Sequence, residues 1–104
     1  MTQTFAIKVE NDTVFLRLLP ILDMAAAAGL LTSLQSCAAE HSNITLDSEE
    51  VERVSTPCVQ VILAASFKII KAGGSFSIMN MSPGFERGMR DLGLSEYIDI
   101  WSKN

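Results

Sequence analysis

The segment Pro57–Lys71 constrains the fold more than any other part of this sequence. It predicts a helix that is apolar on most faces, with Val59, Val61, Ile62, Leu63, Ala64, Ala65, Phe67, Ile69 and Ile70. Such a helix has to be covered by the rest of the domain or by a partner. Gly73-Gly74 predict its left-handed end, and Lys68 and Lys71 suit its negative C-terminus. The chain must therefore supply a second layer on which this helix can pack.

Short segments of alternating polarity indicate that this layer is a β-sheet. Turn residues at Glu10–Thr13 separate the first two segments and predict a hairpin. A helix between the second and third strands indicates a crossover, and hence a parallel pair. The predicted strands are Phe5–Val9, Val14–Leu19, Asn43–Asp47, Ser75–Asn80 and Tyr97–Trp101.

Two further helices complete the pattern. Asp23 is predicted to cap a helix that runs from Met24 to about Glu40, because the alanines after it have high helix propensity. Its predicted buried stripe contains Leu30, Leu31, Leu34 and Ala38. Ser82-Pro83 predicts the start of the last helix, and Gly93 its end, with Phe85, Met89 and Leu92 on one face. The fold class is therefore α/β, a mixed sheet with packed helices in the order β-β-α-β-α-β-α-β.

Length and charge limit the classes of function. The 104 residues predict a single domain, 1–104, with one core. The net charge is −4 and no Lys/Arg run occurs, which argues against nucleic acid or an anionic membrane as partner. A mean hydropathy of +0.27 indicates a surface used for association. The apolar segments Met24–Leu31 and Val59–Phe67 are too short or interrupted to insert into a membrane.

The start of the chain lacks the features of a signal peptide, and the two cysteines lack CxxC spacing. Both observations predict a cytoplasmic protein with reduced thiols.

The stretch "VSTPCVQVIL", which begins at Val54, admits several interpretations. With Pro57 as the first helical residue, Thr56 is the expected N-cap. Alternatively, Thr56 or Ser55 is a phosphoacceptor, since a helix N-terminus favours phosphate, although Pro57 removes one donor. Cys58 is expected to be a small buried hydrophobe, the alternative being a reactive thiol with a lowered pKa.

The other polar candidates are weaker. Cys37 and His41 have the i, i+4 spacing of metal ligands, but no further ligands accompany them, so no metal site is predicted. The acidic cluster of Asp47, Glu49, Glu50 and Glu52 is expected to be solvated loop charge. Phosphate-binding, dinucleotide-binding, zinc-protease and nucleophile-elbow motifs do not occur, so the sequence predicts neither an enzyme nor a cofactor.

Three places resemble the STAS domains, the fold of bacterial anti-sigma factor antagonists. Leu19–Asp23 looks like the family's Gly-x-Leu-Asp turn, with Pro20 in place of the glycine. Leu46–Val59 is similar to Leu-Asp-Leu-Ser-x-Val-x-x-Ile-Asp-Ser-Ser-Gly-Leu. Lys71–Leu94 resembles the Gly-Gly strand, the Asn-x-Ser/Pro turn and the Gly-Leu ending. Together these segments cover nearly the whole chain in the family's order.

One departure bears on function. In phosphorylated STAS proteins the helix begins with Asp-Ser-Ser-Gly, and the second Ser accepts phosphate. Ser55, Thr56, Pro57 and Cys58 fall on these four positions, so the usual acceptor is replaced by a residue without a hydroxyl. Accessory subunits of phospholipid transporters in the family carry Asp-Thr-Gly-Gly instead, and Thr56 matches their Thr.

The resemblance implies a non-catalytic bacterial signalling module, in a sigma-factor, chemotaxis or stress-response pathway. Its expected partner is a regulatory protein, such as an anti-sigma factor or a histidine-kinase-like ATPase. The contact residues would be Asp23 and the helix start Ser55–Gln60, that is Ser55, Thr56, Pro57, Cys58 and Gln60. The alternative is a cytoplasmic accessory subunit of a phospholipid ABC transporter, bound to the permease.

Overall fold

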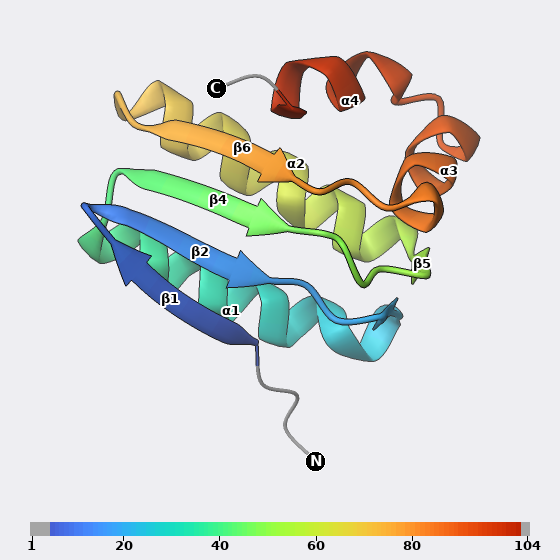
Figure 1. Ribbon diagram of the computed structural model, residues 1–104, viewed down its shortest axis with the longest axis horizontal. Helices are drawn as coiled ribbons and strands as arrows, with labels where there is room; N and C mark the ends of the chain where they lie inside the picture. Colours follow the sequence, from blue (N-terminus) through green and yellow to red (C-terminus); the bar gives the residue numbers. More distant parts are fainter. Residues whose placement is uncertain (1–4, 103–104) are drawn as a thin grey trace.

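A computed structural model describes residues 5–102 and shows alternating strands and helices (Figure 1). The elements are β1 (Ala6–Glu10), β2 (Thr13–Arg17), β3 (Ile21–Leu22), α1 (Met24–Glu40), β4 (Asn43–Asp47), β5 (Arg53–Val54), α2 (Thr56–Lys71), β6 (Ser75–Met79), α3 (Pro83–Asp91) and α4 (Ser95–Ser102). The predicted α/β class and mixed sheet are confirmed.

Four strands form the main sheet, in the order β1-β2-β4-β6. β1 and β2 form the predicted antiparallel hairpin, and their turn residues Asn11 and Asp12 have φ angles of 49° and 69°. Positive φ at both turn positions is the geometry that a two-residue hairpin requires. The pairs β2–β4 and β4–β6 are parallel because a helix connects the strands of each pair.

The core lies between the sheet and the helices α1 and α2, which pack side by side behind it (Figure 1). Val14, Leu16, Ile44 and Leu46 point from the central strands into this core and are at most 1% exposed. The buried residues of α1 are Ala26, Leu30, Leu34 and Cys37. The predicted stripe was therefore wrong at Leu31 and Ala38, which lie on the exposed side of α1.

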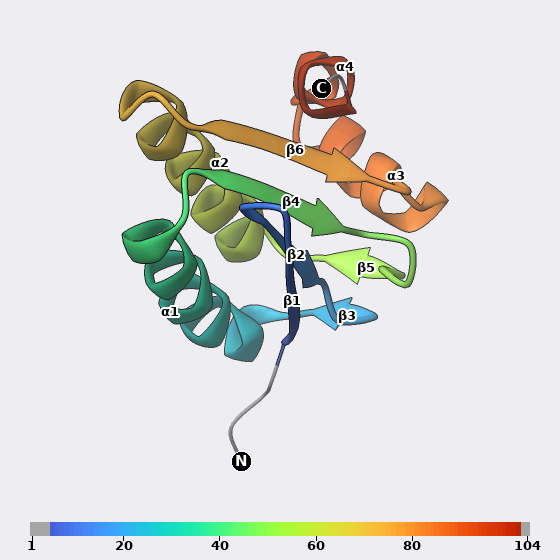
Figure 2. The same ribbon diagram turned by 60° about the vertical axis from the view of Figure 1, so that its left-hand side comes forward.

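The last element differs from the prediction, because Tyr97–Trp101 belongs to the helix α4 and not to a strand. Leu94, Tyr97, Ile98 and Trp101 pack against the core at helical spacing. Trp101 is 1% exposed and meets the ring of Phe76 edge-on, at 5.8 Å between centroids. Figures 1 and 2 both show α4 beside β6, on the side away from β4.

The structure adds a small second sheet, in which β3 and β5 are parallel partners. It lies between the ends of the main strands and the beginnings of α1 and α2 (Figure 2). Within residues 5–102, no helix combines the length and the apolar character needed to span a bilayer.

Candidate partner-binding site at the start of α2

The pairing of β3 with β5 places the starts of α1 and α2 next to each other. Leu22 is the register partner of Val54, and the Ser55 N–H donates to the Leu22 carbonyl oxygen at 2.7 Å. Asp23 and Ser55, the residues that follow these strands, therefore lie side by side. Both helix N-termini point toward the same end of the molecule (Figure 2).

The helix caps differ between the two starts. Asp23 caps α1 as predicted, because its Oδ1 accepts the Ala26 N–H at 3.1 Å. At α2 the predicted cap was wrong: Ser55 is the N-cap residue, Thr56 is the first helical residue, and Pro57 follows it. The reason is non-local, since the bond from Ser55 N–H to Leu22 holds Ser55 in the extended conformation. Ser55 Oγ is buried and has no hydrogen-bond partner within residues 5–102.

Exposure divides the predicted contact residues into two groups. Asp23, Thr56 and Gln60 are exposed and Pro57 is half-buried, so these side chains can meet a partner. Cys58 is fully buried, so its side chain packs beneath the exposed side chains and cannot itself meet a partner. Met24 is 76% exposed and occupies in α1 the position that Thr56 occupies in α2. Met24 was not among the predicted contact residues, although its place directly after the Asp23 cap marks it as a neighbour of the site.

Cys58 joins the two helix starts. Its Sγ donates to the Asp23 carbonyl oxygen at 3.3 Å. Burial raises the pKa of the Cys58 thiol and the Asp23 charge raises it further, whereas the nearby Ser55 hydroxyl lowers it. The net pKa is raised, which contradicts the lowered pKa of the reactive-thiol interpretation.

The only histidine in the chain is too far away to act as a base for Cys58. His41 is the C-cap of α1, and this helix has 17 residues. At 1.5 Å per residue it separates His41 from the Asp23 end by about 25 Å. Cys58 therefore has neither this imidazole base nor exposure to solvent.

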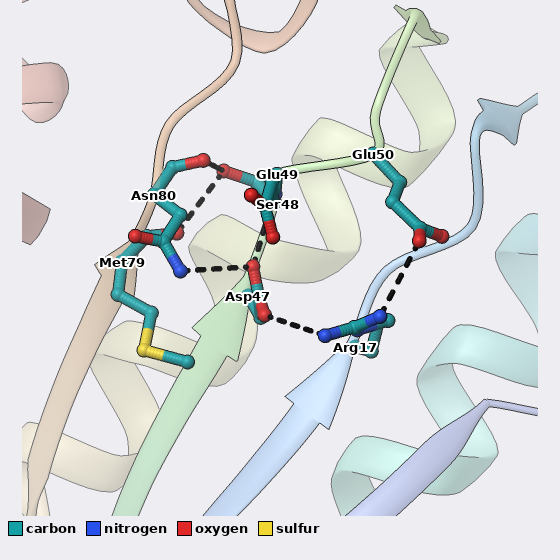
Figure 3. A network of polar contacts seen from close by, with 7 residues as sticks. All are labelled: Arg17, Asp47, Ser48, Glu49, Glu50, Met79 and Asn80. Atoms are coloured by element: carbon teal, nitrogen blue, oxygen red, sulfur yellow. Dashed lines mark hydrogen bonds and ion pairs between the residues drawn. The ribbon is translucent and has the colours of Figure 1, made fainter.

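A polar network joins the C-terminal ends of β2, β4 and β6 (Figure 3). Asp47 is only 5% exposed, so the prediction of a fully solvated acidic cluster was wrong for this residue. Its carboxylate accepts the Glu49 N–H at 3.0 Å and an Asn80 side-chain N–H at 3.5 Å, and it pairs with Arg17 at 3.5 Å. Arg17 also pairs with Glu50 at 3.3 Å. The network ties β2, β4 and β6 to the loop that precedes β5.

Helix α3 holds the other side of that loop. The Ser82 hydroxyl donates to the Val51 carbonyl oxygen at 2.5 Å and accepts the Phe85 N–H at 3.0 Å, so Ser82 caps α3 at the predicted start of this helix. Gly84 lies so close to Glu52 that an added Cβ would stand 2.3 Å from the Glu52 carbonyl oxygen. The segment before α2 is therefore fixed between β3 and α3.

The remaining sequence candidates lie away from this site. Cys37 is buried in the core, and burial, followed by the charge of Glu40, raises the pKa of its thiol. In the described part of the chain, no three His, Cys, Asp or Glu side chains come together in a way that could hold a metal ion.

Comparisons with known proteins agree with this architecture. The family model described as "Mlab, STAS domain" matches residues 5–100. The search of curated protein sequences finds no match. The unphosphorylated anti-sigma factor antagonist SpoIIAA has a similar structure, with a TM-score of 0.77 and 19% identity over 96% of this chain and 86% of that one.

Two further anti-sigma factor antagonist structures are similar. The putative one from Thermotoga maritima has a TM-score of 0.76 and 20% identity, covering 90% of this chain and 82% of that one. The one from Mycobacterium paratuberculosis has a TM-score of 0.78 and 18% identity, covering 90% and 80%. The fold is thus that of the anti-sigma factor antagonists, and the chain belongs to the STAS domain family.

Proposed function

We propose that this STAS domain is a non-catalytic regulatory module that binds a regulatory protein through the starts of α1 and α2. The observation that carries this proposal is the exposed group of Asp23, Met24, Thr56 and Gln60, which lies beside the partly buried hydrogen bond between Cys58 and Asp23. A rigid base lowers the entropic cost of binding, because these side chains do not have to be organised first. The fold likeness to anti-sigma factor antagonists supports an anti-sigma factor or a histidine-kinase-like ATPase as partner, in the cytoplasm.

Thr56 is the phosphoacceptor that we favour. Pro57 stands where the resemblance places the usual acceptor and has no hydroxyl, while Ser55 Oγ is buried. The Thr56 side chain is exposed in the first turn of α2. A phosphate there would gain from the positive end of the helix and would add about −1.5 to −2 charges to the binding surface.

A second candidate is a cytoplasmic accessory subunit of a phospholipid ABC transporter. The exposure of Thr56 favours it, because this residue matches the Thr of the Asp-Thr-Gly-Gly start that such subunits carry. The same surface would then face the permease.

Partner capture from native cells tests both candidates. The tagged wild type is compared with Thr56→Glu and with Thr32→Glu, a matched control that adds the same charge on an exposed position of α1. We expect a kinase-like ATPase or anti-sigma factor with the wild type and the control, and its loss with Thr56→Glu. A permease in its place would establish the transporter subunit. Equal retention by all three proteins would contradict the proposed surface.

Mass spectrometry tests whether Thr56 accepts phosphate. Intact-mass and peptide spectra of the protein purified from its cells should place any phosphate on Thr56. A phosphate on Ser55 instead would show that α2 opens at its start, contrary to our proposal.

A further inference from the structure

A second surface lies at the far end of the same two helices. A groove of about 460 Å³ opens between the C-terminal halves of α1 and α2. Small-molecule sites have volumes of roughly 300–1,000 Å³, so this groove is large enough for a ligand. Lys68 on its rim follows Thr56 by 12 residues, which is about 18 Å along α2. The groove is therefore separate from the proposed partner surface.

The groove exists because small side chains face each other across the helix pair. Packed helices normally interdigitate without large voids, and alanines leave such space unfilled. Leu31, which is 41% exposed, is the main large apolar side chain of the groove, and the nearly buried Leu34 and Ile69 also line it. The small residues that border it are Ala38, Ala39, Ala64, Ala65, Ala72 and Gly74.

The polar residues of the groove favour an anion. Gln35, His41, Ser42 and Lys68 line it, and each can donate a hydrogen bond. Among residues 5–102, no acidic side chain lines it, although the chain carries 12 acidic residues and a net charge of −4. Lys68 forms no ion pair within residues 5–102. An apolar body with an unpaired cation at its rim complements an amphiphile with one negative end.

We propose that this groove binds the carboxylate form of a medium-chain fatty acid, with the tail between the small residues and the carboxylate at Lys68. A group the size of a water molecule takes up about 30 Å³, so the groove volume of about 460 Å³ holds roughly fifteen such groups. A saturated chain of about ten to twelve carbons with its carboxylate has that size. The proposal is independent of the partner surface, because it involves different residues at the other end of α2.

Titration of the ¹⁵N-labelled protein with decanoate, kept below its micelle concentration, tests the proposal. We expect saturable amide shifts at the groove residues and none that saturate at Thr56 or Gln60. Hexanoate, octanoate and decanoate should bind in that order, each about tenfold tighter than the one before, because two more methylene groups are buried. Decyltrimethylammonium has a tail of equal length and the opposite charge, and it should not compete.

Two pairs of variants locate the ligand. Ala38→Phe fills the groove and should weaken decanoate binding at least tenfold, whereas Ala28→Phe, on an exposed α1 position outside the groove, should not. Lys68→Gln should weaken binding about three- to tenfold through loss of a charge-assisted hydrogen bond. Lys71→Gln, in the same last turn of α2 but outside the groove, is its control.

Several results would overturn this assignment. One is the absence of saturation, and another is equal binding of the cationic amphiphile. A third is the same loss of affinity in a groove variant and its control. Shifts centred on the exposed Phe67 and Ile70 would place the ligand on another part of α2 and would also reject the groove. Because Lys68 is exposed, Lys68→Gln should fold normally and keeps the test decisive if Ala38→Phe does not fold.

Discussion

At the scale of single residues, the pKa of the Cys58 thiol depends more on burial than on its position in the first turn of α2. A thiol in the first turn of a helix is near the positive end of the dipole, which favours the thiolate. Cys58 is nevertheless fully buried and donates to the Asp23 carbonyl oxygen, an interaction that requires the protonated form. Its raised pKa follows from this environment. The hydrogen bond of this residue joins the starts of α1 and α2.

Stability should therefore fall at alkaline pH. The thiols ionise in the unfolded chain near the ordinary pKa of about 9, whereas the folded pKa values of Cys58 and Cys37 are raised. The stabilisation is fully present below pH 9 and is lost as the pH rises through the folded pKa. Urea unfolding between pH 7 and pH 10.5 measures this loss. The variant Cys37→Ala/Cys58→Ala should lose less free energy of unfolding over that range, and an equal loss would contradict the assignment.

At the scale of elements, the three longest helices begin in different ways. Asp23 and Ser82 accept N–H groups of their helices, whereas Ser55 makes no such bond. The start of α2 is held instead by the backbone bond from Ser55 to Leu22 and by the thiol of Cys58. A cap side chain thus stabilises the starts of α1 and α3, whereas the neighbouring strand β3 stabilises the start of α2.

Replacing each serine separately tests this difference. Ser82→Ala should lower the free energy of unfolding by about 2 kcal/mol, because it removes a cap and leaves the Val51 carbonyl oxygen without its donor. Ser55→Ala should change it by no more than about 0.5 kcal/mol, since no side-chain bond is lost. Denaturant unfolding of both variants gives the comparison. Equal costs would show that Ser55 Oγ does cap α2.

The contact between α3 and the segment before α2 gives another prediction. Gly84→Ala would place a methyl group against the Glu52 carbonyl oxygen and force α3 away. We expect a loss of about 1–3 kcal/mol of stability, typical of overpacking. Partner binding should weaken as well, because the segment 51–54 leads directly into the surface that we propose for the partner. Arg87→Ala, at an exposed position of the same helix, is the control and should leave both unchanged.

At the scale of the whole molecule, local periodicity was enough to predict the order of most helices and strands but not the residues at which they begin and end. The hairpin, the parallel strands and the helices α1 to α3 follow from patterns within each segment. β3 and β5 were missed because two residues have no periodicity. Tyr97–Trp101 fits both a strand and a helix, and only its packing on Phe76 decides. The N-cap of α2 also depends on a residue distant in the sequence. The backbone bond from the Ser55 N–H to the Leu22 carbonyl oxygen makes Ser55 the cap in place of the predicted Thr56.

The helix α4 should also protect the edge of the main sheet from pairing with another chain. β6 is the terminal strand of the main sheet, and α4 lies beside it (Figure 1). An uncovered edge strand offers unpaired N–H and C=O groups to another chain. Deleting residues 95–104 also removes Trp101 from Phe76, and losing a buried tryptophan costs about 3–5 kcal/mol.

Light scattering and denaturant unfolding of the shortened chain test this role of α4. We expect both self-association and a lower free energy of unfolding. Trp101→Phe keeps α4 and most of its apolar contact, so this variant should have the same oligomeric state as the full chain, with a smaller loss of stability. If the shortened chain were a monomer as stable as the full one, α4 would not be part of the cooperative fold, and the contact with β6 would not protect the edge.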